Sequence, residues 1–287
     1  MSTAPQRQRP YWTALVLPLA LYLVVFLVIP FIHIVVLSFY THSPTRIWTP
    51  ELTTANYVGL ADASFLTVLA RTLRLGLVST LICVLFGYPL AYFLARADRR
   101  VALIGLFFLV MPLMVSAVIR TFGWLVILGR NGLVNGAITA LGLERLPLLY
   151  NETAVVIGLA NVFVPFMVLP LMASIERINP ALEEAARNLG ASWFATFRRV
   201  ILPLSRPGLI SGCLLVYSAA ISAFVVPMLM GGARVRVIGR QIYDQLLISY
   251  QWPNASAIAT LLVIATTSLA FVVLALMRRS ARQEEGA

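Results

Sequence analysis

The sequence is poor in acidic residues and contains no lysine. Its 287 residues include only 11 acidic side chains, against 22 basic ones that are all arginine. Charged residues make up 11% of the chain, whereas soluble domains carry about 25%. Hydrophobic residues make up 60%, and the mean hydropathy is +0.89. Because a chain of this size cannot hide so much apolar surface in a soluble core, we expect an integral membrane protein, which excludes a soluble enzyme and a free nucleic-acid-binding protein.

Residues that commonly carry catalysis, metals or disulfides are also scarce. The two cysteines, Cys83 and Cys213, lie inside apolar runs and indicate no disulfide framework. The two histidines, His33 and His42, have no second ligand-type residue at a metal-binding spacing. No phosphate-binding loop of the G-x-x-x-x-G-K-[ST] type is present. We therefore expect no metal, no cofactor, no catalytic residue and no enzyme activity in this chain.

Six long apolar stretches are free of acidic residues and nearly free of arginine. A bilayer core of about 30 Å requires roughly 20 helical residues, which each stretch supplies. The stretches are 11–40, 75–95, 101–129, 153–175, 207–231 and 255–277, with Arg120 inside the third. We predict an all-α protein with six transmembrane helices, in which one domain (13–279) lies between two tails (1–12 and 280–287). The prolines inside the stretches are interpreted as kinks that serve packing.

The distribution of arginine predicts which loops face the cytoplasm. If the N-terminus lies inside, the internal segments hold 13 arginines in 58 residues, and the external segments hold 8 in 80. Basic residues favour the cytoplasmic side of membrane proteins. We therefore expect both termini to be cytoplasmic. The internal segments are 1–12, 96–100, 176–206 and 278–287.

The longest internal segment, 176–206, has the pattern of two short helices. Asn179 and Pro180 suit the N-cap and the first helical position, and Glu183 would complete a capping-box-like start. Gly190 follows where the turn after a helix requires a positive φ. Ser192 is expected to cap the second helix, and Pro203 and Pro207 to end it. One apolar face of the first helix is expected at Leu182, Ala185, Ala186 and Leu189.

The same segment carries a spaced motif. It consists of Glu184-Ala185-Ala186, three residues, Gly190, nine residues, and then Val200-Ile201-Leu202-Pro203. This pattern resembles the EAA loop of binding-protein-dependent ABC importer permeases, in which the last four positions are I-x-L-P. The one departure is Val200 in place of isoleucine. An alternative interpretation is an amphipathic connector that lies on the membrane surface.

The resemblance implies a set of partners and a role for the loop. It implies a multi-pass permease of the bacterial inner membrane that works with cytoplasmic ABC ATPase subunits, a second permease subunit in a heterodimer, and a periplasmic solute-binding protein. The loop would dock in a cleft of the ATPase and transmit its movement. The residues implied in this coupling are Glu184, Ala185, Ala186, Gly190, Leu202 and Pro203.

Further segments are similar to permeases of the spermidine/putrescine branch. They are Pro147–Asn151, Phe224–Pro227 with Gly231-Gly232, Ile242–Gln245, and Trp252-Pro253. The resemblance therefore implies a polyamine as the solute. The alternatives are a permease of the same type for iron, an opine or a phosphonate, and an ion-coupled secondary transporter. The absence of Asp and Glu from all six stretches argues against the last alternative.

Four residues inside the apolar stretches are candidates for the solute path. Arg120 is the only charge within a stretch, so it either serves the path or a subunit interface, or reaches the outer membrane surface. Trp124 lies one turn further on, where it either stacks on Arg120 or belongs to the interfacial aromatic belt. Tyr217 and Phe224 lie on the fifth stretch, which commonly lines the path in the family that the loop resembles.

Overall fold

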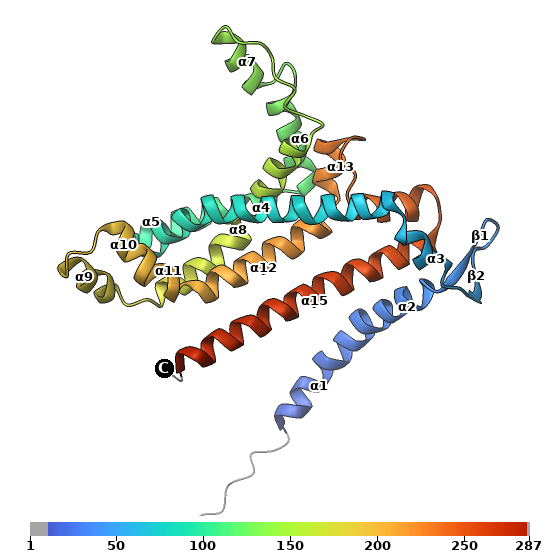
Figure 1. The fold of residues 1–287 in the computed structure, drawn as a ribbon, viewed down its shortest axis with the longest axis horizontal. Coiled ribbons are helices and arrows are strands. Elements are labelled where there is room, and N and C mark those ends of the chain that lie inside the picture. Colours follow the sequence, from blue (N-terminus) through green and yellow to red (C-terminus); the bar gives the residue numbers. More distant parts are fainter. Residues whose placement is uncertain (1–10, 286–287) are drawn as a thin grey trace, which may run out of the picture. The chain divides into compact units, whose positions relative to one another are not determined.

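The computed structural model describes residues 11–285, with side chains described for 17–271 and 275, and it is built mainly of helices (Figure 1). Five of the described helices are long and apolar enough to cross a membrane, and a sixth span results if one bent helix pair is counted as a single span. The predicted all-α class is confirmed, and the count of six remains a prediction. Residues 1–10 and 286–287 of the two predicted tails lie outside the described residues. The chain divides into two compact units.

The first unit contains residues up to Asp62 together with Asp244–Ile264. Its N-terminal helix is apolar. The helix is also continuous, because a π-helical turn joins its two α-helical parts. The elements are α1 (Tyr11–Leu23), η1 (Val24–Val28), α2 (Ile29–Leu37), β1 (Tyr40–Ser43), β2 (Ile47–Leu52), α3 (Ala55–Val58), η2 (Gly59–Ala61), η5 (Asp244–Ile248) and the start of α15 (Trp252–Glu285).

An antiparallel hairpin follows the first apolar stretch. In this hairpin β1 pairs with β2, so that Thr41 lies opposite Thr49 and Ser43 opposite Ile47. His42 Nδ1 lies 3.0 Å from the carbonyl oxygen of Ile47. The hairpin is therefore held by local contacts on both sides of its turn.

The second unit contains Ala63–Tyr243 and the part of α15 after Ile264. Its core is formed by three helices that pack against one another, α4 (Ala63–Arg96), α8 (Glu152–Glu176) and α12 (Arg206–Ser222). Helices α4 and α8 run in the same direction, because one buried cluster joins Leu75 to Val155 and another joins Leu94 to Ile175. Helix α12 runs in the opposite direction. The ends of these three helices define the two ends of the second unit.

Glycines allow α12 to approach α8 closely. Gly208 and Gly212 form a G-x-x-x-G pattern, the spacing that brings membrane helices together. A Cβ added at Gly208 would lie 2.7 Å from the carbonyl oxygen of Pro170 on α8. A Cβ at Gly212 would lie 2.8 Å from Sδ of Met167. At these two positions the backbones of α12 and α8 are therefore so close that any side chain on α12 would clash with α8.

Two of the predicted transmembrane stretches are broken. The third, 101–129, consists of α5 (Arg99–Val110), a 3-10 turn η3 (Met111–Met114) and α6 (Ala117–Leu128). The break follows Pro112, and Val115 is extended with ψ 134°. The fifth, 207–231, is divided into α12 and α13 (Val225–Gly231), because Ala223 is extended with ψ 135°. The expectation of two continuous helices was therefore wrong.

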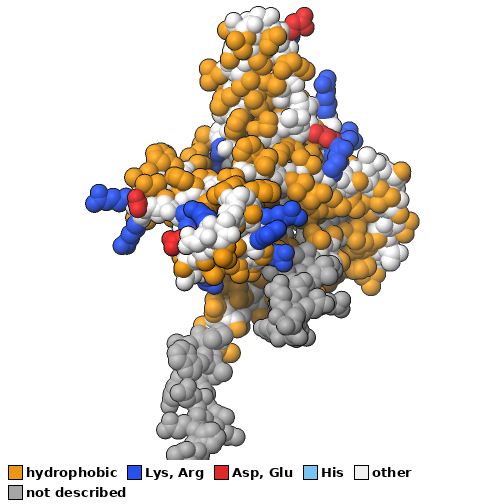
Figure 2. Space-filling model, turned by 60° about the vertical axis from the view of Figure 1, so that its left-hand side comes forward, with side chains coloured by type: hydrophobic (Ala, Val, Ile, Leu, Met, Phe, Trp, Pro, Cys, Tyr) orange, Lys and Arg blue, Asp and Glu red, His pale blue; other side chains and the backbone are white. Residues whose placement is uncertain are grey.

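The remaining helices of the second unit are short. They are α7 (Leu133–Ala140), α9 (Pro180–Asn188), α10 (Trp193–Thr196), the π-helical η4 (Phe197–Ile201), α11 (Leu202–Leu204) and α14 (Ile238–Tyr243). Figure 2 shows hydrophobic side chains over most of the visible surface, with the charged side chains gathered in a few places. This pattern is that of a protein whose outer surface meets lipid.

Candidate functional site

The segment that carries the spaced motif begins with a helix that is capped at both ends. At the start of α9, Oδ1 of Asn179 accepts a hydrogen bond from the amide of Ala181 at 3.0 Å. At its end Gly190 has φ +85°. The amide of Gly190 donates to the carbonyl of Arg187 at 2.9 Å, and that of Ala191 donates to the carbonyl of Ala186 at 3.0 Å. This is the Schellman motif, so the predicted role of Gly190 in the turn is confirmed.

A buried carboxylate ties α9 to the end of α4. Glu183 is only 4% exposed. It accepts hydrogen bonds from Nε of Arg96 at 2.9 Å, from Nη2 of Arg96 at 2.6 Å, and from the hydroxyl of Tyr92 at 2.8 Å. Nη2 of Arg96 also donates to the carbonyl of Ile178 at 3.1 Å. We refer to Glu183, Arg96 and Tyr92 as the latch.

The contacts of Glu183 differ from those predicted for the start of α9. The carboxylate of Glu183 was expected to turn back toward the N-cap, but it binds α4 instead. Glu183 is the fourth residue after Asn179, one position beyond the acidic residue of a capping box. Its charge is compensated by Arg96, and Arg187 contributes a weaker contact at 3.8 Å. Acid and base thus satisfy each other away from water, as buried charges require.

The latch holds α9 so that its apolar side faces outward. Leu182 is 48% exposed and Leu189 is 89% exposed. Glu184 and Ala185 are exposed as well, and Ala186 is half-buried. The residue types on the apolar side were predicted correctly, but among the described residues most of that side is left exposed. An exposed apolar surface beside an exposed carboxylate is typical of a surface that binds another protein.

The second half of the segment packs against α4 through aromatic rings. Ser192 caps α10 as predicted, with Oγ accepting from the amide of Ala195 at 3.3 Å. Phe197 stacks on Trp193 with ring centroids 5.7 Å apart, and meets the edge of Tyr88 at 5.1 Å. The hydroxyls of Tyr88 and Ser205 lie 2.5 Å apart. The segment is therefore attached to α4 at two places, by the latch and by the contacts of Tyr88 with Phe197 and Ser205.

The motif's last residues lie at a sharp change of direction. Leu202 and Pro203 form α11 with Leu204, and the helix pair Trp193–Leu204 and Arg206–Ser222 is bent by 70°. The second helix was predicted to end at Pro203 and Pro207, and it ends between them, at Leu204. The bend brings the segment from the end of the core into α12.

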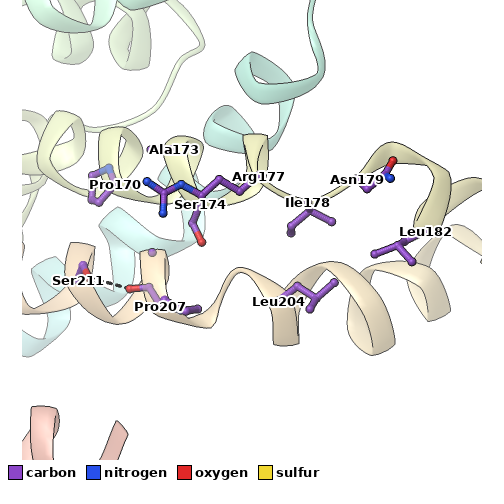
Figure 3. A pocket seen from close by; sticks show the side chains of 11 residues that line it. Pro170, Ala173, Ser174, Arg177, Ile178, Asn179, Leu182, Leu204, Pro207 and Ser211 are labelled. Atoms are coloured by element: carbon purple, nitrogen blue, oxygen red, sulfur yellow. Dashed lines mark hydrogen bonds between the residues drawn. The ribbon is translucent and has the colours of Figure 1, made fainter. Parts of the chain in front are cut away.

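Two grooves flank this segment. The first, of 660 Å³, lies between the α8–α9 connection and α11–α12, as Figure 3 shows. Its wall includes Ser174 and Arg177 on one side and Leu204 and Pro207 on the other. The second, of 380 Å³, is largely apolar and lies between α4 and the segment, where Tyr92, Trp193 and Leu202 line it. The segment therefore projects from the core with recesses on both sides.

Comparison with known proteins identifies the family of the chain. Residues 83–284 match the family described as the binding-protein-dependent transport system inner membrane component. The match covers more than two thirds of the chain. The chain belongs to this family. The permease is therefore a membrane transport component rather than an enzyme.

Individual relatives agree with the family. The permease is 38% identical to the spermidine/putrescine transport system permease protein PotB of Haemophilus influenzae, over 88% of each chain. It is 39% identical to PotB of Escherichia coli, over 85% of this chain and 89% of that one. A chain of a bacterial ABC transporter involved in import of the acidic polysaccharide alginate has a TM-score of 0.76, with 21% identity over 94% and 95% of the two chains. This structural likeness shows the shared fold.

The four candidates for the solute path lie on different elements. Nη1 of Arg120 on α6 donates to the carbonyl of Pro112 at 2.8 Å, and Nε has no hydrogen-bond partner among the described residues. Trp124 packs against the buried cluster around Leu75 and Val155. The structure thus gives Arg120 a local role at the broken third stretch, and Trp124 a packing role. Their roles in a path remain predictions.

The other two candidates, on and just beyond α12, have neighbours that indicate packing. A Cβ added at Gly76 of α4 would lie 3.3 Å from the ring of Tyr217, so this ring covers α4. Phe224, at the break after α12, is 38% exposed and stacks on Tyr243 with centroids 5.5 Å apart. Unlike the loop residues, these four are not brought into one site.

Proposed function

We propose that this permease carries the membrane path of an importer for a polyamine such as spermidine or putrescine. Cytoplasmic ABC ATPase subunits supply the energy, a second and different permease subunit completes the path, and a periplasmic binding protein delivers the solute. The identity of 38–39% with PotB over most of both chains supports the polyamine class. The family match supports the dependence on a binding protein.

One observation carries the proposed coupling role. Helix α9 exposes Glu184, Ala185 and Leu189, while the neighbouring Glu183 fixes the same helix to α4. The exposed side is the surface for the ATPase, and the Gly190 turn and the Leu202-Pro203 bend set its direction. Because the latch compensates the only buried charge of the helix, the free carboxylate of Glu184 is available to a basic group of the ATPase.

The proposed function predicts a strict set of requirements for uptake. Proteoliposomes that contain this permease, its partner permease and the ATPase should accumulate labelled spermidine only when ATP is inside and loaded binding protein is outside. Proteoliposomes with the permease alone and an ion gradient are the control, since the described spans offer no carboxylate for ion coupling. Uptake by the control would exclude the proposed mechanism. A complex that requires ATP but accepts only iron, an opine or a phosphonate would replace the polyamine.

We propose that the latch and the α9 surface lie in the cytoplasm of a bacterium, beneath its inner membrane. The higher density of arginine in the internal segments supports this orientation. A cysteine introduced at Leu189, which is 89% exposed, should react with a membrane-impermeant maleimide only after the cells are opened. A cysteine at Leu141, which is 78% exposed on the predicted opposite side, should react in intact cells. The reverse labelling pattern would overturn the orientation.

A further inference from the structure

Three arginines line a groove that the transport mechanism described above does not use. The groove has a volume of 630 Å³ and lies within the second unit. Arg130, Arg145 and Arg234 come from three separate connections, and all three are exposed. The rest of the lining is Leu128, Leu146–Tyr150 and Ala233. A concave surface with three guanidinium groups is a surface that favours anions.

A buried amide brings two of these arginines together. Asn135 on α7 is 1% exposed. Its Nδ2 donates to the carbonyl of Gly129 at 3.1 Å and to the carbonyl of Leu146 at 3.0 Å, and its Oδ1 accepts from the amide of Leu146 at 2.9 Å. Gly129 and Leu146 are the residues next to Arg130 and Arg145. The backbone positions of these two arginines are therefore held by the fold.

The position of Arg234, the third arginine, is set by hydrogen bonds that involve the loop before α8 and the end of α13. Tyr150 has φ +60°, an uncommon value for a residue with a side chain, and its amide donates to the carbonyl of Met230 at 2.8 Å. Arg240 donates to the carbonyl of Gly232. The first bond joins the loop before α8 to α13, and the second holds the chain just after α13. Together they place Arg234 beside the loop of Arg145.

The surroundings of the groove leave its charge largely uncompensated. Glu152, the first residue of α8, is engaged by Arg71 and Arg74 of α4. Among the described residues, Nη1 of Arg145 donates a hydrogen bond to the side-chain amide oxygen of Asn131 at 3.1 Å. Nη1 of Arg71 also reaches the backbone carbonyl of Arg234 at 3.4 Å, so the basic region continues onto α4. The nearby loop contributes one further acid, the exposed Glu144.

The groove lies at the opposite end of α8 from the latch. Helix α8 has 25 residues and is about 37 Å long, which exceeds the thickness of a bilayer core. The groove borders its first residue, and the latch borders the connection after its last. If the latch faces the ATPase, as proposed above, the groove faces the side from which solute arrives.

We propose that this arginine groove docks an acidic surface of the solute-binding protein. The inference rests on the proposed function. Three guanidinium groups repel a polycation such as spermidine, so the groove is not where free solute collects. They attract carboxylates, and bidentate pairing with carboxylates suits arginine. The groove thus selects the protein that carries the solute while its charge keeps free polyamine away.

The test measures association of the binding protein with the intact transporter in lipid nanodiscs. In the test variant Arg130→Glu, Arg145→Glu and Arg234→Glu are combined, and a second variant has glutamine at the same positions. The matched control is Arg46→Glu, an exposed arginine outside the groove. We expect the association rate at low salt to fall at least about tenfold with glutamate and less with glutamine, and to become less sensitive to salt. The control should bind like the wild type.

Several outcomes would overturn the proposal. Unchanged association of both variants, with correctly folded complexes, removes the groove from docking. Normal association with impaired uptake would instead make the groove a site for the solute or another small anion. If the Arg46→Glu control lost as much of the association rate as the groove variants, the cause would be the general surface charge and not the groove. The wild-type complex separates this test from the proposed function, because ATP-dependent spermidine uptake by the wild type is measured in the same nanodisc preparation after its transfer to liposomes.

Discussion

Replacing Glu183 with alanine should abolish transport, whereas replacing its neighbour Glu184 with alanine should only weaken docking of the ATPase. Glu183 is 4% exposed, and its carboxylate receives three hydrogen bonds from Arg96 and Tyr92. Removing one partner of a buried ion pair costs about 3–5 kcal/mol, because the other charge remains buried. Glu184 is exposed and has no such partner to leave behind.

The expected mechanism is a release of α9 rather than a loss of the whole fold. The latch joins one short helix to α4, while the large clusters between α4, α8 and α12 do not include Glu183. In the Glu183→Ala variant the ATPase should still hydrolyse ATP, but hydrolysis should no longer respond to the loaded binding protein. Limited trypsin digestion should cleave after Arg187 faster than in the wild type, since α9 is no longer held.

Exchange of the two charges provides the decisive control. Arg96→Glu alone should behave like Glu183→Ala, and the double variant with Glu183→Arg should recover part of the uptake. Glu183→Gln should be intermediate, because the amide retains a hydrogen-bond acceptor for Tyr92. Normal uptake and normal trypsin resistance of Glu183→Ala would show that the latch has no positioning role.

Adding a methyl group at Gly208 should destabilise the permease more than adding one at Gly212. Both glycines face α8, but their neighbours differ. The new Cβ at Gly208 would lie 2.7 Å from the backbone oxygen of Pro170, which cannot move independently of the helix. The new Cβ at Gly212 would first meet Sδ of Met167 at 2.8 Å, and a methionine side chain can adjust. Overpacking of this kind costs about 1–3 kcal/mol.

Thermal unfolding of the purified variants in detergent measures this order. We expect Gly208→Ala to have the lowest midpoint, then Gly212→Ala, and Gly208→Leu not to accumulate in the membrane. Gly123→Ala is the matched control, because it lies in helix α6 and a Cβ there would meet nothing within 4 Å. It should be neutral or slightly stabilising, since alanine favours helix over glycine by about 1 kcal/mol. Equal midpoints for all three alanine variants would contradict the close contact.

Local features of the site could be predicted from the sequence, and distant partners could not. Asn179, Gly190 and Ser192 act on residues within a few positions, so their identity determines the caps. Glu183 lies 87 residues from Arg96 in the chain, and no local pattern indicates that pairing. The only available signal was an acid directly before the motif, together with the three arginines of the predicted internal segment 96–100.

The breaks in the third and fifth stretches show a related limit. Hydropathy reports whether a stretch suits lipid, but not whether its backbone stays helical. Pro112 was interpreted as a kink, yet the chain leaves the helix there and begins again at Ser116, whose side chain caps α6. At the second break, Ala223 is extended four residues before Pro227, which had likewise been interpreted only as a kink. The three arginines of the groove likewise come from separate connections, which only the fold unites.

Helix α4 has a consequence for the membrane itself. It contains 34 residues without interruption, with Arg71 and Arg74 near one end and Arg96 at the other. The uncharged section between Arg74 and Arg96 has 21 residues, or about 32 Å, which matches a hydrocarbon core of about 30 Å. A bilayer of different thickness must therefore tilt this helix or draw a guanidinium toward the acyl chains. One charged end of α4 borders the groove, where Arg71 contacts the backbone of Arg234, and the other end carries Arg96 of the latch. Hydrophobic mismatch therefore acts on both places at once, and the lipid chain length becomes part of the transporter's mechanics.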